Sequence, residues 1–587
     1  MFPNEEKDGR KWSLPSWQQL IFLVKTLSLK EKKIFLSALF LACSLFAIWG
    51  LVIYFKETDK KPALGGSYTE GIQGQPLYLN PIVARGNPVD NDLSNLIFSS
   101  LFHYDANGKL EQDLVQDWER SEDGLVYTLH LKPGVKWHDG KDLTAEDVIF
   151  TINLILNPAY GSAFRANLEG VTFEKKDDQT LVLTLKKAYT PFLHNLTFGI
   201  LPKHLWGDIT SDKFLLTELN RKPIGSGMYS FYKLEKGKDG KITSITLRAN
   251  NQYYGEKPHL KELVFQFYAD WSEILNAYSQ GQIKGISYIE TANLKDASKE
   301  NGLKIYELPT TRVYSVFFNQ QKSAVLADQK VREALNVATE KEELLRGVLE
   351  GKGVVINTPF LPNTLGFSPD LNKYEFNLEK ARNILKEDGW EILNEKERKK
   401  VSAEGNANTL YNAKTKQSLS FTLTVANYPE LIKTADLLKK QWEQIGVNIV
   451  LDITDTSETL QTKISERNYE ALLFGEVLQA DPDPTPFWHS NSKQSPGLNL
   501  ALFDDKEADS LLDQARQEVS EQKRAELYHA FGEIINQKTP AIFLFSPSYL
   551  YGVFEDYKDV GVKIIYDSSD RLDDIAKRYL FVSRTRK

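Results

Sequence analysis

The hydrophobic pattern is most regular near the start of the chain, where Ile34 to Phe55 form 22 residues without a charged side chain. As a helix this run would be about 33 Å long, enough to cross the hydrocarbon core of a bilayer. A buried core helix of that length normally has a polar face, whereas only Ser37 and Ser44 interrupt the apolar surface here. The pattern predicts one transmembrane helix over residues 34–55.

The segment before this run, "WQQLIFLVKTLSLKEKK" over residues 17–33, mixes leucines with lysines. Apolar residues cluster on it with lysines between them, which is typical of a short amphipathic helix. We expect it to lie on the anionic inner surface of the membrane.

After a polar stretch at 56–65 the pattern becomes that of a globular α/β protein. "YTLHLKPGVKW", "LVLTLKKAYTPFL", "SITLRANNQYY" and "ELVFQFY" alternate apolar and polar residues and predict strands. "LTAEDVIFTINLIL" predicts a helix in which Thr144 is the N-cap and Asp147 completes a capping box.

A longer alternation of elements follows between residues 420 and 475. "SFTLTVAN", "VNIVLDI" and "YEALLFG" read as strands, and a helix from Pro429 to Gly446 and a second one in "SETLQTKISERN" separate them. This β-α-β-α-β order predicts neighbouring parallel strands with right-handed connections. Ligands of open α/β sheets bind beyond the carboxyl ends of the strands, so the next loop, "EVLQADPDPTPFWHS" at 476–490, is a candidate binding loop. A rigid surface turn is the alternative.

Charge and cysteine content indicate on which side of the membrane each part lies. Residues 1–33 carry a net charge of +3, and the remaining chain carries −10. The basic tail should stay in the cytoplasm and the acidic body should be exported to the extracellular or periplasmic side. The body contains no cysteine and therefore no disulfide, and its acidity argues against a nucleic-acid partner.

The single cysteine, Cys43, permits a second interpretation, a cleaved and lipidated signal. Ala42 before it fits such a signal, but Phe40 and Leu41 are bulky and apolar residues continue to Phe55. An uncleaved anchor explains the downstream half of the run, so we expect Cys43 to be an unmodified apolar residue.

Motifs of catalysis and cofactor binding are not found in the sequence. There is no G-x-S-x-G elbow, no phosphate-binding loop and no histidine spacing of a helical zinc site, and "DPDPTP" lacks the glycine and terminal Glu of a calcium loop. We expect no catalytic residue, metal or cofactor.

Several segments in order resemble the family 5 extracellular solute-binding proteins, which are the dipeptide- and oligopeptide-binding components of ABC importers. The resemblance runs from about Gly66 to Val553 and is carried by "VKWHDGKDLTAEDVIFTI", "PIGSGMYSF", "VFFNQQKSAVLADQKVREALNVATEKEELL" and "PDPTPFW". Each fragment is weak alone, and their order and spacing are specific.

The resemblance implies a two-lobed periplasmic-binding-protein-like (type II) α/β fold with an extra subdomain in the first lobe, here preceded by the single transmembrane helix. The expected divisions are a cytoplasmic tail (1–33), the helix (34–55), a linker (56–65), lobe 1 (66–310, with the subdomain at about 88–220), lobe 2 (311–537) and a return to lobe 1 with a C-terminal tail (538–587).

The same resemblance places the 476–490 loop at the ligand cleft. The expected ligand-binding residues are Asp481, Asp483, Phe487 and Trp488, followed by Tyr68, Tyr229, Tyr314 and Phe317 from the first lobe and hinge. Peptide binders of the family hold the ligand's α-amine with an aspartate at the position that is Leu478 here. This departure puts recognition of a free amine in doubt.

The expected function is capture of an extracellular solute, a peptide by resemblance, by lobe closure and its delivery to a membrane permease driven by an ATPase. The alternative is a membrane-anchored surface hydrolase acting on peptides or sugars, for which Asp481 and Asp483 are the only candidate acid–base pair. A sensor or adhesion module that binds without transport is a third possibility.

Overall fold

The computed structural model describes residues 16–362, 364–371, 374–401, 403–455 and 458–586. Residues 1–15 of the expected cytoplasmic tail lie outside the described residues, as do residues 456–457 near the start of the second helix expected after residue 446. The described chain divides into two units, one of residues 1–63 and 581–587 and the other of residues 64–580.

The first unit contains the two expected helices, but the boundary between them lies earlier than predicted, so residues 29–33 belong to the helix of the apolar run. Helix α1 (Trp17–Thr26) ends before α2 (Leu29–Glu57) begins. Ser28 separates them because Glu31 Oε2 accepts a hydrogen bond from Ser28 N at 2.8 Å while the Ser28 hydroxyl accepts one from Glu31 N at 3.4 Å. This capping box starts a new helix. Among the described residues, α2 is the one helix long and apolar enough to cross a membrane.

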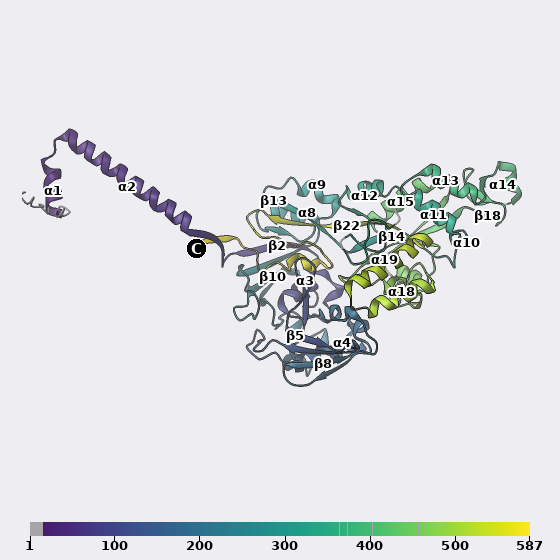
Figure 1. The fold of residues 1–587 in the computed structure, drawn as a ribbon, viewed down its shortest axis with the longest axis horizontal. Helices are drawn as coiled ribbons and strands as arrows, with labels where there is room; N and C mark the ends of the chain where they lie inside the picture. The colour runs from purple at the N-terminus through teal and green to yellow at the C-terminus, as the bar shows by residue number, and fades with distance from the viewer. Residues whose placement is uncertain (1–15, 363, 372–373, 402, 456–457, 587) are drawn as a thin grey trace, which may run out of the picture. The chain divides into compact units, whose positions relative to one another are not determined.

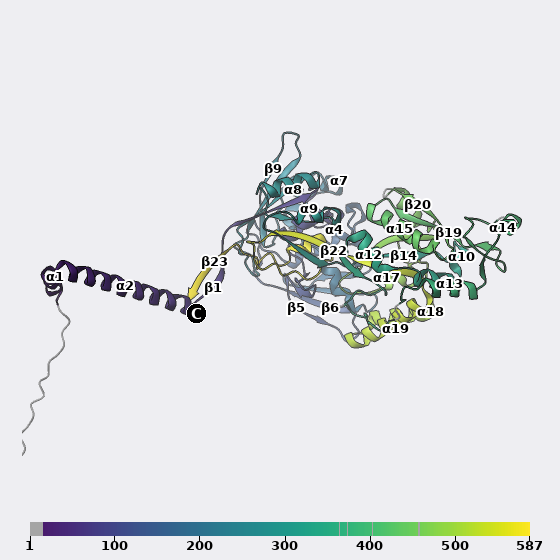
Figure 2. The same ribbon diagram turned by 90° about the horizontal axis from the view of Figure 1, so that it is seen from above.

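The expected linker at 56–65 contains a strand. Strand β1 (Thr58–Ala63) pairs antiparallel with β23 (Phe581–Arg586), with Lys60 opposite Arg584. Both views show these strands side by side (Figures 1 and 2). "TDKKPA" has no alternation of its own, and its hydrogen-bond partner lies at the other end of the chain, so the sequence pattern did not predict this strand.

The main sheet of the second unit has twelve strands, and its two halves share one long strand, β22 (Ala541–Phe554). The first half of β22 pairs with β14 (Arg312–Phe318) and β15 (Gly353–Val355), and the second half pairs with β12 (Gly285–Ile286) and β13 (Leu303–Pro309). Separate hydrophobic cores lie on the two halves of this sheet, and we call the two parts the first and second lobes.

The first lobe is built on the strand order β22-β12-β2-β11-β10-β9, with β2 (Ser67–Gln73), β11 (Glu262–Tyr268), β10 (Ile242–Ala249) and β9 (Tyr229–Lys236). Its helices are α3 (Pro88–Ile97), α6 (Lys203–Trp206), α7 (Ser211–Phe214), α8 (Trp271–Ser279) and α9 (Leu294–Ala297).

A smaller four-stranded sheet belongs to the same lobe and lies apart from the main sheet in Figure 1. Its order is β5 (Val115–Arg120), β6 (Val126–Leu131), β8 (Thr180–Thr184) and β7 (Thr172–Lys175). A short pair, β3 (Phe102–Tyr104) with β4 (Leu110–Gln112), and helices α4 (Ala145–Leu156) and α5 (Arg165–Leu168) accompany it. Helix α4 starts with the expected capping box of Thr144 and Asp147.

The second lobe contains the expected β-α-β-α-β segment. Strands β19 (Ser420–Ala426), β20 (Asn448–Thr454) and β21 (Ala471–Val477) alternate with α15 (Pro429–Glu443) and α16 (Glu458–Ser465). Strand β19 pairs in parallel with both β20 and β21, so the predicted parallel strands are confirmed. The α15 stripe of Leu431, Ala435, Leu438 and Trp442 is buried on the sheet.

The other helices of this lobe are α10 (Ala324–Ala327), α11 (Gln329–Val337), α12 (Lys341–Leu349), α13 (Leu378–Glu387), α14 (Glu395–Val401), α17 (Thr485–Trp488), α18 (Lys506–Gln517) and α19 (Glu521–Lys538). A small sheet of β16 (Trp390–Ile392), β17 (Leu410–Asn412) and β18 (Gln417–Ser418) completes it.

The glycines of "PIGSGMYSF" allow α3 to approach the start of β9 closely. A Cβ at Gly225 would lie 1.9 Å from the carbonyl oxygen of Ile97, and one at Gly227 would lie 2.4 Å from that of Leu96. Gly227 N donates to Ile97 O at 2.8 Å. Only glycine permits this contact, which places the end of α3 beside the cavity described next.

Candidate functional site

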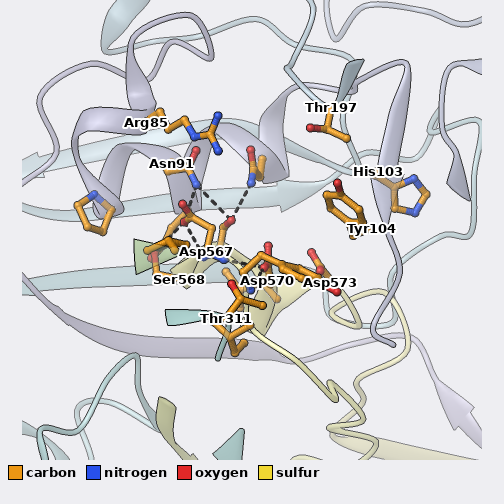
Figure 3. Close-up of a pocket in the computed structure, with 18 of the residues that line it drawn as sticks. Arg85, Asn91, His103, Tyr104, Thr197, Thr311, Asp567, Ser568, Asp570 and Asp573 are labelled. Atoms are coloured by element: carbon orange, nitrogen blue, oxygen red, sulfur yellow. Dashed lines mark hydrogen bonds between the residues drawn. The ribbon is translucent and has the colours of Figure 1, made fainter. Parts of the chain in front are cut away.

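A cavity of about 1050 Å³ lies between the two lobes and is the candidate binding site. The first lobe lines it with α3, β3, the 194–199 segment and the C-terminal 565–573 segment, and the second lobe with Tyr314, Glu430 and residues 477–480. Its size is at the upper end of the range for small-molecule sites. Figure 3 shows polar side chains of the first lobe and of the C-terminal segment around it.

The chain crosses between the lobes beside this cavity, at β13–β14 and at β22. Thr310 Oγ1 donates to Pro547 O at 2.6 Å, and Ser546 Oγ donates to Thr310 O at 3.0 Å. These bonds join the two crossing strands. Because Thr310, Thr311 and Pro547 also line the cavity, a ligand there contacts the hinge as well as both lobes.

The 476–490 loop contributes Leu478, Gln479 and Ala480 to the cavity lining. The carboxylates of Asp481 and Asp483 instead form ion pairs with arginines of their own lobe. Asp481 forms an ion pair with Arg524 of α19, and their side chains are 9% and 8% exposed.

Asp483 lies in a second ion pair, with Arg516 of α18. Arg516 Nε donates to Asp483 Oδ2 at 2.9 Å, and the Asp483 side chain is buried. Neither Asp481 nor Asp483 belongs to the cavity lining. Two carboxylates that are each neutralised by an arginine are also poorly suited to act as an acid–base pair, which removes the only catalytic candidates of the hydrolase alternative.

The two aromatics of this loop face the interior of the second lobe. Trp488 in α17 is 2% exposed, and its ring centroid lies 5.8 Å from that of Phe543 and 6.2 Å from that of Phe317. Phe487 packs against the same cluster. Phe317 itself is buried there, so these three residues form core and not cavity wall.

The three expected tyrosines have different environments. Tyr314 lines the cavity and packs on Phe545. Tyr68 is buried in the first lobe, where its hydroxyl donates to Glu70 at 2.9 Å and lies 2.8 Å from that of Tyr551. Tyr229 is fully buried and its hydroxyl donates to Leu260 O at 3.1 Å. Of the eight expected binding residues, the structure brings Tyr314 to the cavity.

The C-terminal segment, which the sequence patterns did not predict as part of the site, provides much of the first-lobe wall. Helix η7 (Ser568–Leu572) carries Arg571, whose buried guanidinium lies 2.6 Å from Glu70 and 2.7 Å from Asp92 of α3. Asn91 Nδ2 donates to Asp567 Oδ1 at 2.7 Å. These contacts hold the segment against α3, and the dense acidic run "YDSSDRLDD" was the available signal in the sequence.

Tyr104 and His194 form a neutral polar wall of the cavity. Tyr104 Oη lies 2.9 Å from His194 Nδ1. Burial, followed by the positive charge of Arg524, lowers the pKa of His194 to about 4, so its imidazole is neutral at physiological pH. The pair offers hydrogen-bonding groups and an aromatic surface without charge.

The cavity is strongly acidic. Seven carboxylates line it, from Asp92, Asp113, Glu290, Glu430, Asp567, Asp570 and Asp573, against two arginines, Arg85 and Arg312. Within the described part of the chain, no group of three or more Asp, Glu, His or Cys side chains is placed to hold a metal ion. The arrangement can therefore bind a solute through polar and ionic contacts from two lobes.

Comparisons with known proteins agree with this geometry. Residues 109–498 match the middle region of the bacterial extracellular solute-binding proteins, family 5. The oligopeptide-binding protein AppA of Bacillus subtilis is 29% identical over 506 residues, which cover 84% of this chain and 88% of that protein. The dipeptide-binding protein of Escherichia coli is 26% identical, with coverages of 80% and 88%.

Solved structures show the same two-lobed fold. The structure of B. subtilis AppA in complex with a nonapeptide has a TM-score of 0.67 at 27% identity and covers 89% of this chain and 100% of that one. NikZ from Campylobacter jejuni in complex with Ni(L-His) has a TM-score of 0.69 at 25% identity, with coverages of 87% and 99%. The predicted α/β fold and the family resemblance are confirmed: the chain belongs to the bacterial extracellular solute-binding proteins of family 5.

Proposed function

We propose that this chain is the membrane-anchored receptor of an ABC importer, which binds a peptide between its lobes and delivers it to a permease driven by a cytoplasmic ATPase. The observation that carries the proposal is the cavity lined by both lobes and the hinge. Relatives described as oligopeptide- and dipeptide-binding proteins support a peptide as the solute.

Lobe closure explains how such a receptor signals that it is loaded. Contacts from both lobes to one ligand exist only when the lobes are closed, so the ligand shifts the population toward the closed form. We assign the first lobe to residues 66–310, with its subdomain at about 88–220, the second lobe to 311–537, and the returning strand and C-terminal segment to 538–587. Tyr314 is the proposed second-lobe ligand contact.

The N-terminal helix α2 is the proposed anchor, with the basic tail in the cytoplasm and the binding unit outside. Its length and apolar character support this role, as does the net charge of +3 on residues 1–33. An anchor keeps the receptor near its permease and raises its effective concentration there.

The test is calorimetry on the detergent-solubilised full chain with peptides of two to nine residues. We expect saturable binding that Tyr314→Ala weakens, because the substitution removes part of the cavity wall. Tyr314 also packs on Phe545 in the core of the second lobe, so thermal unfolding of the variant is measured beside its affinity. Absence of binding by every peptide length would refute the peptide receptor. A co-purification of the full chain with the permease and ATPase tests the transport assignment.

A further inference from the structure

The acidic cavity has several carboxylates that are already satisfied by the protein. Each has a strong internal partner: Asp92 pairs with Arg571, Asp113 accepts from Ser100 N, Asp567 accepts from Asn91, and Asp570 accepts from the backbone N–H groups of Tyr566 and Asp567. These four are part of the scaffold of the site.

Asp573 differs from them. Its side chain is exposed, lines the cavity, and makes no ion pair or hydrogen bond within the part of the chain that the structure describes. It follows Asp570 by one helical turn, and Figure 3 shows both near the C-terminal side of the cavity. Loss of bulk water around the group, followed by the negative charges of Asp570 and Asp574, raises the pKa of Asp573. A cation placed there would relieve this repulsion.

Two further groups at this position are suited to a cationic ligand. Tyr104 and Tyr566, whose ring centroids are 5.2 Å apart, both line the cavity, and Asp570 accepts from Tyr566 N at 2.7 Å. Aromatic faces attract ammonium and guanidinium groups. The carboxylates and the two rings therefore combine charge and aromatic surface at one place.

Thr311 of the hinge adds an unsatisfied hydrogen-bonding group. Its hydroxyl is buried, with the residue 1% exposed, and has no hydrogen-bond partner in the described structure, yet the residue lines the cavity. Thr311 N donates to Ile565 O at 3.3 Å, so the backbone of Thr311 lies beside the segment that continues into Tyr566. A buried hydroxyl without a partner is costly unless a ligand or water completes it.

We propose that Asp573, with Asp570 beside it, binds a cationic group of the solute, so that this receptor selects positively charged ligands such as basic peptides. The inference rests on the proposed function and names the ligand class of that same site. The cationic group is either the α-amine of a peptide or the side chain of a lysine or arginine, which share this chemistry.

The 476–490 loop of the second lobe offers no free carboxylate for this role. Leu478 lines the cavity and has no charge to offer, and Asp481 and Asp483 are bound to Arg524 and Arg516. A positive group that entered against Leu478 alone would be uncompensated. Glu430 is a second-lobe carboxylate that also lines the cavity, but the positive charge of Arg312 lies near it. Burial, followed by the charge of Glu290, raises the pKa of Glu430, and Arg312 lowers it against these effects. We therefore assign the charge selection to the C-terminal segment of the first lobe.

The experiment compares three nonapeptides of otherwise identical neutral sequence that carry lysine, norleucine or glutamate at their variable positions, each with a free and an acetylated N-terminus. Affinities for the full chain are measured by calorimetry at pH 7.5. We expect one positive group to strengthen binding about 10- to 100-fold, as charge-assisted hydrogen bonds do. If acetylation of the N-terminus removes the gain in affinity, the bound cation is the α-amine. If replacement of lysine by norleucine removes the gain, the bound cation is the lysine side chain.

Variants assign the effect to Asp573. Asp573→Asn should abolish the preference for the cationic peptide and leave the affinity for the neutral one unchanged, while Asp573→Glu should retain the preference. The matched control is Asp208→Asn, because Asp208 is exposed and outside the cavity lining.

Equal binding of all charge forms, or a preference that survives Asp573→Asn, would overturn this inference and leave the peptide receptor intact. Failure of every peptide to bind, neutral ones included, would overturn the proposed function itself. The two failures are thus distinguishable.

Discussion

Tyr189 of the first lobe lies against Asp483 of the second, with 3.4 Å between Tyr189 Oη and Asp483 Oδ2. Arg516 binds the same carboxylate oxygen, and its guanidinium carbon lies 4.8 Å from the centroid of the Tyr189 ring. This contact joins the lobes directly. We therefore expect Asp483 to act in lobe closure, and its predicted contact with the ligand stays a prediction.

Tyr189→Phe removes the hydroxyl from this contact and should weaken closure. One hydrogen bond contributes about 0.5–1.5 kcal/mol, so the dissociation constant for a bound peptide should rise about 2- to 10-fold. Calorimetry measures the affinity, and small-angle scattering measures the open fraction. Tyr232→Phe, at an exposed position of β9, is the control. An unchanged affinity and scattering profile would show that the contact has no part in closure.

The Asp481–Arg524 pair should be required for stability. Both side chains are buried, so Asp481→Asn or Arg524→Met leaves an unpaired group and should lower the free energy of unfolding by about 3–5 kcal/mol. The double variant Asp481→Asn/Arg524→Met should lose less than the sum of the two single losses. Chemical denaturation measures each value.

Glu395→Gln is the control for that pair, because the Glu395–Lys399 pair is exposed and should contribute below about 1 kcal/mol. If the decreases in unfolding free energy of the two single variants simply add up in the double variant, Asp481 and Arg524 do not stabilise the fold as a pair.

Trp488→Ala should lower the stability of the second lobe and leave the affinity of the folded protein for a peptide unchanged. Removing a large buried aromatic side chain costs about 3–5 kcal/mol, because a cavity remains among Phe317, Phe503 and Phe543. Thermal unfolding and calorimetry below the unfolding temperature separate the two effects. A Trp488→Ala protein of unchanged stability and weakened peptide affinity would show instead that Trp488 contacts the ligand.

Asp573→Asn should raise the melting temperature at pH 8 and leave it unchanged at pH 4. The pKa of Asp573 in the folded state is raised by loss of bulk water and by Asp570, Asp574 and Asp105, while Arg578 lowers it. The folded state therefore holds the proton more tightly than the unfolded state. The penalty for ionising it is absent below pH 4 and grows as the pH rises.

The expected gain from that neutral replacement is about 1–3 °C at pH 8. Thermal scans of both proteins at the two pH values measure it. A gain of equal size at both pH values would mean that the effect is not electrostatic.

The membrane topology gives the last prediction. Protease added to intact cells should digest the binding unit and protect the N-terminal tail, and Cys43→Ser should leave the protein membrane-bound with no lipid mass lost. Release of the Cys43→Ser protein into the medium would instead establish the lipidated form.

Local patterns predicted the elements of the fold well because they depend on neighbours in the chain. The stripe of α15 and the capping box at Thr144 are found where their spacing placed them. The pairing of β1 with β23 was not predictable in this way, since neither strand has an alternating pattern that identifies its partner.

The sequence by itself determined the apolar run of membrane length, the order of strands and helices, and the family of the chain. The tertiary structure alone decided which side chains face the cavity. Asp481 and Asp483 are directed away by arginines on α18 and α19, and Trp488 is covered by residues from β14 and β22. Arg571 binds Asp92 of α3, which lies 479 residues before Arg571 in the chain, and so holds the segment that carries Asp573 beside α3. Burial and ion pairing arise between segments far apart in sequence, so the type and spacing of nearby residues cannot reveal them.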